Sequence, residues 1–302
     1  MSACAGRQLT ERMTENTRDK QHTEHVKTVT TVLVTGATGR TGSRVADAAR
    51  AAGLTVRAAS RSGEVRFDWA DPGTWDAALR GADGAYLVYP PDVGAPGAAD
   101  AVGALARRAV ALGVRRLVLL SARGEDQALP AEAALRASGA DWTVLRCAWF
   151  DQTFSEGPLL EQVRGAELAF AAPDALHEPF IDVRDIADVA VTVLRDTTDR
   201  YAGQVVELTG PQALTWGEAL AEVGRATGSP KRYVAVPVRE YGAALREFGV
   251  PEEEVAFLVD LFGTLLDGRN ESVTGAVERV LGRAPRPFSA FATQTATSGT
   301  WK

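Results

Sequence analysis

The chain has 302 residues, of which 45% are hydrophobic and 24% charged, so it is long enough to bury a core and is excluded from the disordered class. Its formal net charge of −6 argues against a nucleic-acid-binding protein, and no apolar run approaches the ~20 residues that a membrane span needs. The polar N-terminus lacks the apolar core of a secretory signal, and Cys4 and Cys147 cannot build a disulfide framework, so we expect a cytoplasmic protein.

Residues 1–28 are polar and charged and have no hydrophobic period, so we expect a flexible tail there. From residue 29 onward, short β-branched apolar runs alternate with segments whose apolar residues recur at helical spacing. The expected strands are 29–35, 54–59, 65–69, 85–89, 116–121 and 142–146, and the expected helices between them are 40–52, 71–81, 97–112 and 130–138. This alternation predicts an α/β fold, a Rossmann-type doubly wound parallel sheet with helices on both faces.

After residue 146 the regular alternation ends. We expect a short strand at 180–183, a helix at 185–195, a strand at 204–208, and then a helix that a Thr215–Glu218 capping box opens and Gly228 ends. Three helices are expected between 239 and 282. We therefore divide the chain into a cofactor-binding domain, residues 29–156 and 177–212, and a smaller, mainly helical substrate lobe, residues 157–176 and 213–302.

The strongest motif is a glycine-rich loop that follows the first expected strand and opens the first helix. Gly36 allows the tight turn, Gly39 lets the backbone approach a pyrophosphate, and Gly42 lets the helix pack closely on the strand. The free N–H groups and the dipole of the helix N-terminus favour an anion. We therefore assign dinucleotide binding to the whole loop, Gly36, Ala37, Thr38, Gly39, Arg40, Thr41 and Gly42.

The end of the second expected strand selects the cofactor. An NAD site carries an acidic residue about 20 residues beyond the first glycine, where it binds the ribose hydroxyls. This chain has Ser60 and Arg61 there and no acid, and a guanidinium beside a hydroxyl suits the 2′-phosphate of NADP. Asp68, after the third strand, is suited equally to accepting a hydrogen bond from the adenine amine and to ending the strand.

Six segments of the chain form a wider pattern: GATGRTG (36–42), ASRS (59–62), LVYPP (87–91), LVLLSARG (117–124), RASGADWTVLRCAWFDQ (136–152) and PFIDVRDIADVAVTVL (179–194). Together they resemble the NmrA-like family, atypical members of the short-chain dehydrogenase/reductase superfamily. The resemblance implies a Rossmann domain with a small C-terminal lobe, NADPH rather than NADH, and a cofactor that faces Tyr89, Pro90, Ser121 and the segment from Cys147 to Phe150. The family includes triphenylmethane-dye and quinone reductases and also redox-sensing transcriptional regulators, so the resemblance is consistent with an enzyme or with a sensor.

The proton donor of the ordinary short-chain dehydrogenases is absent from this sequence. Those enzymes use a Tyr-x-x-x-Lys pair, in which the lysine lowers the pKa of the tyrosine. None of the five tyrosines has a lysine four residues later. We therefore expect hydride transfer without a dedicated strong acid, to an acceptor that stabilises its own product charge, such as a quinone, an iminium ion or a cationic conjugated dye.

Aromatic residues after the sixth expected strand are candidates for the wall of a substrate pocket. Trp149 and Phe150 would flank a planar acceptor, and core packing is the alternative for either ring. Gln152 and Asp151 are suited to orienting a polar group of the substrate or to capping the next helix, and for Asp151 we favour capping.

Two residues are candidates for a weak proton donor. Ser121 ends the fifth strand, where it either binds a substrate or ribose oxygen or satisfies local backbone groups. His177 is expected in a loop, where solvation is the alternative to a proton donor. Arg123 would stabilise an oxyanion or lie in solvent, and Cys147 is expected to be a buried, unreactive thiol. Because Cys147 and His177 are the only soft ligands in the expected folded part, we expect no metal site.

These observations predict an NADPH-dependent reductase that transfers hydride to a small planar, conjugated or quinone-like acceptor without a Tyr-Lys acid. The alternatives are a non-enzymatic NADP(H)-binding sensor and a tailoring ketoreductase of natural-product biosynthesis that relies on Ser121 or His177. We expect a small-molecule partner, no nucleic acid and no membrane, and we leave homodimer formation open.

Overall fold

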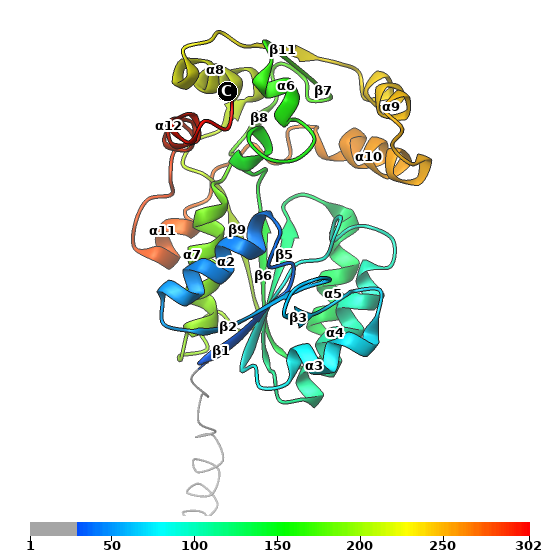
Figure 1. Ribbon diagram of the computed structural model, residues 1–302, viewed down its shortest axis with the longest axis vertical. Coiled ribbons are helices and arrows are strands. Elements are labelled where there is room, and N and C mark those ends of the chain that lie inside the picture. The colour runs from blue at the N-terminus through cyan, green and yellow to red at the C-terminus, as the bar shows by residue number, and fades with distance from the viewer. Residues whose placement is uncertain (1–28) are drawn as a thin grey trace, which may run out of the picture.

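The computed structural model describes residues 29–302, so the flexible tail expected at 1–28 lies outside the described residues. A sheet with helices on both sides forms the lower body in Figure 1, and a smaller lobe lies above it. The predicted α/β fold class is confirmed. None of the helices in the described part is long and apolar enough to cross a membrane.

All seven strands of the main sheet run parallel, in the order β3-β2-β1-β4-β5-β6-β9. They are β1 (Thr31–Val34), β2 (Thr55–Ser60), β3 (Val65–Arg66), β4 (Gly84–Leu87), β5 (Arg116–Ala122), β6 (Asp141–Cys147) and β9 (Gln204–Leu208). The apolar run Val32, Leu33 and Val34 is fully buried, because helices cover both faces of β1. The chain crosses to the other side of β1 when it enters β4, and in sheets of this kind ligands bind at the carboxyl ends beside such a crossing.

Two layers of helices cover the sheet. Helices α2 (Arg40–Ala51), α7 (Val183–Arg195) and α11 (Ala276–Leu281) pack on one face, and α3 (Trp75–Leu79), α4 (Ala98–Ala111) and α5 (Leu129–Arg136) pack on the other (Figure 1). At the start of the helix expected from residue 71, Asp71 caps the 3-10 helix η1 (Pro72–Thr74) by accepting a hydrogen bond from the Gly73 N–H at 3.1 Å. Helix α7 is capped in the same way by Asp182.

The lobe is held together by aromatic packing. It contains two short pairs of strands, β7 (Glu167–Phe170) with β11 (Arg232–Ala235) and β8 (His177–Glu178) with β10 (Leu214–Thr215). Its helices are α6 (Leu160–Arg164), α8 (Trp216–Thr227), α9 (Val238–Glu247), α10 (Glu252–Leu265) and α12 (Phe288–Ser298). The Trp216 side chain is fully buried at the centre, with its ring centroid 4.3 Å from that of Phe170.

Several predictions for the second half of the chain need correction. No strand forms at 180–183: Ile181 makes only an isolated bridge to Phe150, because the chain turns at Asp182 to begin α7, and the short strand of this region is β8. Strands β7 and β11 and helices α6 and α12 were not expected. The capping box of α8 and the three helices between 239 and 282 are confirmed. Helix α11 falls within the range predicted for the substrate lobe, but it packs on α7 and β9 of the sheet. The domain boundaries stay a prediction.

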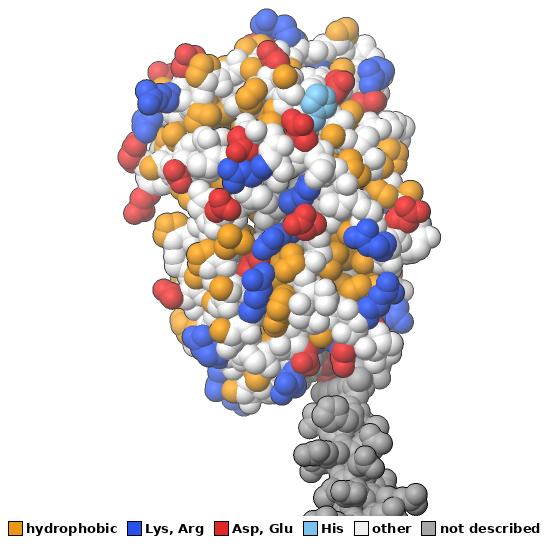
Figure 2. Space-filling view, turned by 180° about the vertical axis from the view of Figure 1, so that it is seen from behind, with side chains coloured by type: hydrophobic (Ala, Val, Ile, Leu, Met, Phe, Trp, Pro, Cys, Tyr) orange, Lys and Arg blue, Asp and Glu red, His pale blue; other side chains and the backbone are white. Residues whose placement is uncertain are grey.

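Charged side chains of both signs are mixed over the face shown in Figure 2. Acidic and basic groups alternate there, and neither sign forms a continuous patch. This face therefore lacks the continuous basic surface with which proteins track a phosphate backbone.

A buried carboxylate joins β5, β6 and α5 at the carboxyl edge of the sheet. Glu132 is fully buried and accepts hydrogen bonds from Ser121 Oγ at 2.8 Å and from Arg146 Nε and Nη2 at 2.8 and 2.7 Å. Arg136 Nη2 adds a fourth hydrogen bond at 2.8 Å. A carboxylate that is buried away from water is stable only when it is hydrogen-bonded. Because its partners lie on β5 and β6, this network orients the ends of both strands.

We predict that Glu132→Ala lowers the free energy of unfolding by about 2–4 kcal/mol, because it leaves Ser121 and Arg146 without their acceptor while both arginines keep some solvent. Urea unfolding at neutral pH measures this. The matched control is Glu252→Ala, which removes an equally close but exposed pair with Arg246 and should barely move the midpoint. Equal losses in the two variants would contradict a special role of the buried network.

Candidate functional site

A cavity of about 990 Å³ opens at the carboxyl ends of the strands, on the side where the lobe lies. At one end it is lined by the glycine loop and the end of β2, and at the other end by α10 of the lobe. Between them its wall comes from the segments after β3, β4, β5 and β6. Most of the residues predicted as a site from the sequence therefore meet around one space.

The glycine loop has the geometry that was predicted for it. Gly36 has a left-handed backbone with φ +59°, and a Cβ at Gly42 would lie 2.2 Å from the carbonyl oxygen of Gly36, so α2 packs directly on the turn. A Cβ at Gly39 would meet only that same oxygen, at 3.2 Å. No side chain caps the N-terminus of α2, which leaves its first N–H groups available to an anion.

The end of β2 carries the features expected for a phosphate. Ser60 and Arg61 both line the cavity, and Ser60 Oγ is buried without a hydrogen-bond partner. Arg61 is exposed and makes no hydrogen bond or ion pair within residues 29–302. The neighbouring Arg57 differs, because it donates to the carbonyl oxygens of Ala77 and Ala78 at 2.6 and 2.9 Å. An orphaned hydroxyl beside a free guanidinium fits an anionic group.

The segment after β3 adds an aromatic wall that the sequence did not reveal. Asp68 lines the cavity, but its Oδ1 already accepts a hydrogen bond from the Ala70 N–H at 3.0 Å. Trp69 lies beside it, donates to the Val88 carbonyl at 2.9 Å and meets the Tyr89 ring edge-on at 5.1 Å. Both rings line the cavity.

The middle of the cavity is formed by Tyr89, Pro90, Ser121 and Cys147. Ser121 is buried and its hydroxyl donates to Glu132, so the oxygen is left to accept a hydrogen bond rather than to donate one. Burial raises the pKa of the Cys147 thiol, which keeps it protonated. A buried thiol of this kind matches the unreactive role expected for it.

Trp149 and Phe150 line the cavity, Trp149 beside the buried cluster that contains α10 and Phe150 beside the cluster that contains α2. Trp149 also packs edge-on against Phe170 and Trp216, with ring centroids 5.8 and 5.3 Å apart. Trp149 therefore packs in the core, as one interpretation expected, and also lines the cavity, while its role as a wall for an acceptor stays a prediction. Leu261 and Leu265 of α10 line the cavity too and belong to the same cluster as Trp149.

Asp151 and Gln152 do not have the geometry expected for them. Gln152 lies outside the cavity lining, because its amide donates to Asp182 Oδ1 at 3.1 Å and accepts from the Val183 N–H at 3.0 Å. Asp151 caps no helix: its carboxyl group is fully buried and has no hydrogen-bond partner. Burial, followed by repulsion from Asp182 and Asp185, raises the pKa of Asp151 well above its usual range.

His177 and Arg123 also differ from expectation. His177 pairs with Thr215 in the β8–β10 ladder and lies outside the cavity lining, with Nδ1 3.0 Å from the Ala175 carbonyl oxygen. Arg123 is buried rather than solvated. Its guanidinium donates to Glu207 at 3.2 Å and to the carbonyl oxygens of Asn270 and Ser272 at 2.7 Å each, so it ties the chain after α10 to the end of the sheet.

Two carboxyl groups in the cavity wall were missed. Asp92 and Glu125 come from the loops after β4 and β5, and Glu125 is only 4% exposed. No pattern in the sequence sets them apart from the other acidic loop residues, because their burial depends on how two distant loops pack. Within the described residues no three His, Cys, Asp or Glu side chains are grouped so as to hold a metal ion.

A second, smaller cavity of about 450 Å³ lies between β9 and α11. It contains none of the predicted site residues. The larger cavity is therefore the candidate functional site.

Comparisons with known proteins identify the family and support the fold. The model of the NmrA-like family matches residues 28–269. An uncharacterized oxidoreductase, YesF, from Bacillus subtilis is 32% identical over 83% of this chain and 90% of its own length. An NADPH-dependent quinone oxidoreductase from Escherichia coli, solved with NADPH, superposes with a TM-score of 0.70 at 21% identity over 87% of this chain and 99% of that chain. The negative transcriptional regulator NmrA, solved with NAD, also superposes with a TM-score of 0.70, at 17% identity over 91% of this chain and 97% of that chain.

We predict that two glycine variants of the loop separate folding from binding. Gly42→Ala forces a methyl group into the Gly36 carbonyl and should lower the free energy of unfolding by about 1–3 kcal/mol. Gly39→Ala should leave stability nearly unchanged but weaken NADPH binding by about tenfold or more, because the second glycine of such a loop lets the backbone approach the pyrophosphate closely. Thermal unfolding and cofactor fluorescence titration measure the two effects.

The matched control is Gly263→Ala in α10, where an added methyl group meets nothing within 4 Å. It should bind cofactor as the unaltered chain does. Normal NADPH affinity in Gly39→Ala would contradict a pyrophosphate site at the loop.

Proposed function

The chain belongs to the NmrA-like family, and on that premise we propose that it is an NADPH-dependent reductase that transfers hydride to a small planar, conjugated or quinone-like acceptor. One observation carries the proposal: a single cavity is lined both by the glycine loop and by Trp149 and Phe150. A dinucleotide held at the loop would extend toward those rings. The volume of about 990 Å³ is large for a small-molecule site and leaves room for an acceptor beside the cofactor.

The preference for NADP rests on the corner of Ser60 and Arg61. The buried hydroxyl of Ser60 lacks a partner and Arg61 is free, so both can bind the 2′-phosphate that distinguishes NADP from NAD. The NADPH-bound quinone oxidoreductase of similar fold supports this choice. Asp68 retains a carboxylate oxygen for the adenine amine, and Trp69 would pack beside the adenine ring.

The side chains at the far end would orient the acceptor and keep water away from it. Reduced nicotinamide, when bound, supplies the hydride. Trp149 is held rigidly by its edge-on contacts with the buried aromatic cluster, and it would form a flat wall for a planar acceptor. Leu261 and Leu265 close this end with apolar surface. The oxygen of Ser121 would accept a hydrogen bond from the ribose, since its proton is given to Glu132.

The second candidate function is a non-enzymatic sensor of NADP(H). The specific observation in its favour is the similarity in fold to a transcriptional regulator that binds NAD. The ketoreductase alternative loses support, because the Ser121 hydroxyl is engaged by Glu132 and His177 lies outside the cavity lining. The YesF relative, whose name marks it as an oxidoreductase, favours the enzyme.

We predict that the protein oxidises NADPH much faster with quinones or conjugated dyes than with simple ketones, because an isolated carbonyl group is the weaker hydride acceptor and the chain has no Tyr-Lys pair to activate it. The measurement is NADPH absorbance against a panel of quinones, cationic dyes, imines and ketones. Tight binding of NADP⁺ with no turnover of any acceptor would replace the reductase with the sensor.

We also predict that Arg61→Ala weakens NADPH binding by about 1–3 kcal/mol and leaves NADH binding nearly unchanged, because only NADPH carries the 2′-phosphate. Arg66→Ala is the matched control: this nearby arginine is exposed, lies 3.8 Å from Asp71 and is not part of the cavity lining. Isothermal titration calorimetry with NADPH and with NADH measures the two affinities. Equal weakening of NADPH and NADH by Arg61→Ala would show that Arg61 does not read the phosphate.

A further inference from the structure

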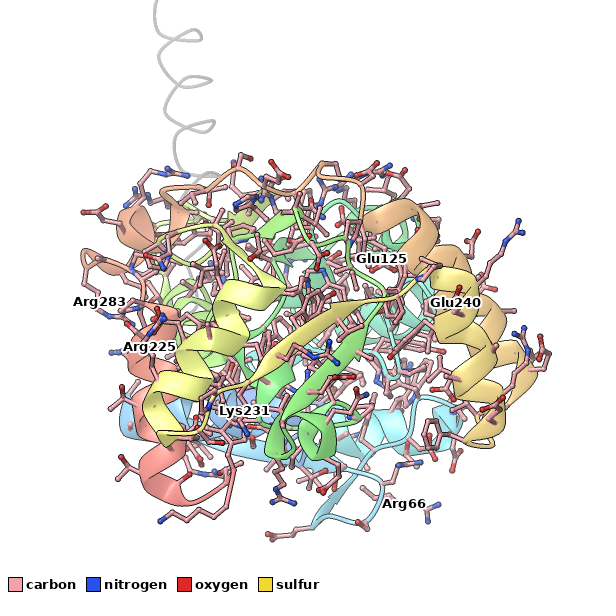
Figure 3. All side chains as sticks on the ribbon, turned by 90° about the horizontal axis from the view of Figure 1, so that it is seen from above. Arg66, Glu125, Arg225, Lys231, Glu240 and Arg283 are labelled. Carbon is pink, nitrogen blue, oxygen red and sulfur yellow. The ribbon has the colours of Figure 1, made fainter. Side chains whose placement is uncertain are left out.

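Glu125 occupies a position in the cavity wall that the proposed function has not yet used. It follows β5 and Gly124, whose φ of +73° turns the chain, and it precedes the short helix η2 (Asp126–Ala128). Its side chain is 4% exposed and lines the same cavity as Ser121 and Trp149. Figure 3 shows Glu125 inside the outline of the molecule, near α10, whereas Arg66 lies on the rim.

The carboxyl group of Glu125 sits in a space that exists only because residue 94 is glycine. A Cβ at Gly94 would lie 2.0 Å from Glu125 Oε1. That oxygen is buried and has no hydrogen-bond partner. The neighbouring Asp92 is held in place by the Gly94 N–H, which donates to its Oδ1 at 2.7 Å. Two loops from neighbouring strands thus bring two carboxyl groups together at the cavity.

No cation of the described residues neutralises Glu125. Arg123, two residues earlier, directs its guanidinium to Glu207 and to the carbonyl oxygens of Asn270 and Ser272. Arg269 pairs with Asp126 at 3.3 Å, and Asp260 of α10 accepts from Gln127. Asp92 is the remaining charged neighbour, and it carries the same sign as Glu125.

These surroundings keep a proton on Glu125. Burial, followed by the effects of Asp92, raises the pKa of Glu125 to about 9. Asp92 acts in two ways, because it repels a second negative charge and because the two carboxyl groups can share a hydrogen bond only while one of them holds a proton. At neutral pH the cavity wall therefore contains a carboxylic acid with a proton to donate.

We propose that Glu125 is the general acid of the reductase and that the preferred acceptor is a neutral, quinone-like molecule whose reduction consumes a proton. This inference rests on the proposed function, and it replaces the expectation, drawn from the missing Tyr-Lys pair, that no dedicated side chain supplies the proton. Hydride from reduced nicotinamide forms a bond to the electrophilic atom of the acceptor, a π bond of the acceptor breaks, and its electron pair arrives on oxygen. That oxygen takes the proton of Glu125, oxidised cofactor is left, and water reprotonates the Glu125 carboxylate.

The two classes of acceptor differ in their need for this proton. A cationic dye becomes neutral when it receives hydride, so its reduction consumes no proton. A neutral quinone becomes an anion unless a proton follows. Glu178 and Asp151 are also buried carboxyl groups without hydrogen-bond partners, but neither lines the cavity, so neither can serve the acceptor.

The decisive experiment compares Glu125→Gln with the unaltered chain on a neutral quinone and on a cationic triphenylmethane dye. We expect kcat for the quinone to fall by about 10²-fold or more, the scale of a lost general acid, while the dye changes little. Glu240→Gln, which makes the same substitution at an exposed site of α9, is the control (Figure 3). Equal falls for both acceptors, or no fall for the quinone, overturn the proposal.

The pH profile and a spectrum provide readouts that a structural role would not move. The acid must be protonated, so kcat for the quinone should fall as the pH rises through about 9. This alkaline limb should vanish in Glu125→Gln and move to lower pH in Asp92→Asn, which removes the repelling charge. A limb that persists in Glu125→Gln argues against the proposal.

Infrared difference spectra between the unaltered chain and Glu125→Gln test the proton without turnover. A carboxylic-acid band at neutral pH that Glu125→Gln removes supports the protonated state, and its absence overturns it. If neither acceptor is reduced by the unaltered chain, the reductase proposal fails and the acid role fails with it, while the band still reports on the proton. The two failures are therefore distinguishable.

Discussion

The close approach of α2 to the turn after β1 is the constraint on which the rest of the site depends. Gly42 lies so near the Gly36 carbonyl that any side chain at this position would clash with the turn, and α2 begins at Arg40, directly after that turn. That contact fixes the direction of the helix N-terminus, and the neighbouring crossing from β1 to β4 opens the space in front of it. The cavity walls contributed by β2, β4, β5 and β6 all take their positions from the same sheet.

The first half of the chain could be predicted well, because its signals are local. Each buried parallel strand is a short apolar run, and glycine or Asp-Pro marks the helix boundaries. The lobe could not be predicted in the same way. Strand β7 pairs with β11, which lies more than sixty residues later, and α12 has serine, threonine and alanine on most of its surface rather than a clear apolar stripe.

In the candidate site too, residues with a local sequence signature could be predicted and residues that depend on tertiary contacts could not. Most residues with a local signature line the cavity, namely Gly36, Thr38, Gly39, Arg40, Thr41, Ser60 and Arg61, and Gly42 forms the close contact between α2 and the turn. His177 and Gln152 looked suitable by residue type alone, and tertiary contacts gave both of them other partners. Glu125 had no local signature, because its environment arises where Gly94 of one loop allows a carboxyl group of another loop to approach.

The hydrogen bonds of Arg123 have a consequence for the segment that contains α9 and α10. It anchors the chain at Asn270 and Ser272, and β11 anchors the chain at residues 232–235, so the α9–α10 segment is a loop closed between two fixed points. That segment brings Leu261 and Leu265 to the cavity wall, and none of its residues belongs to the glycine loop. Leu261, Phe262 and Leu265 also belong to the buried cluster of the lobe, so a change of sequence in this segment alters the cavity wall and the packing of the lobe together.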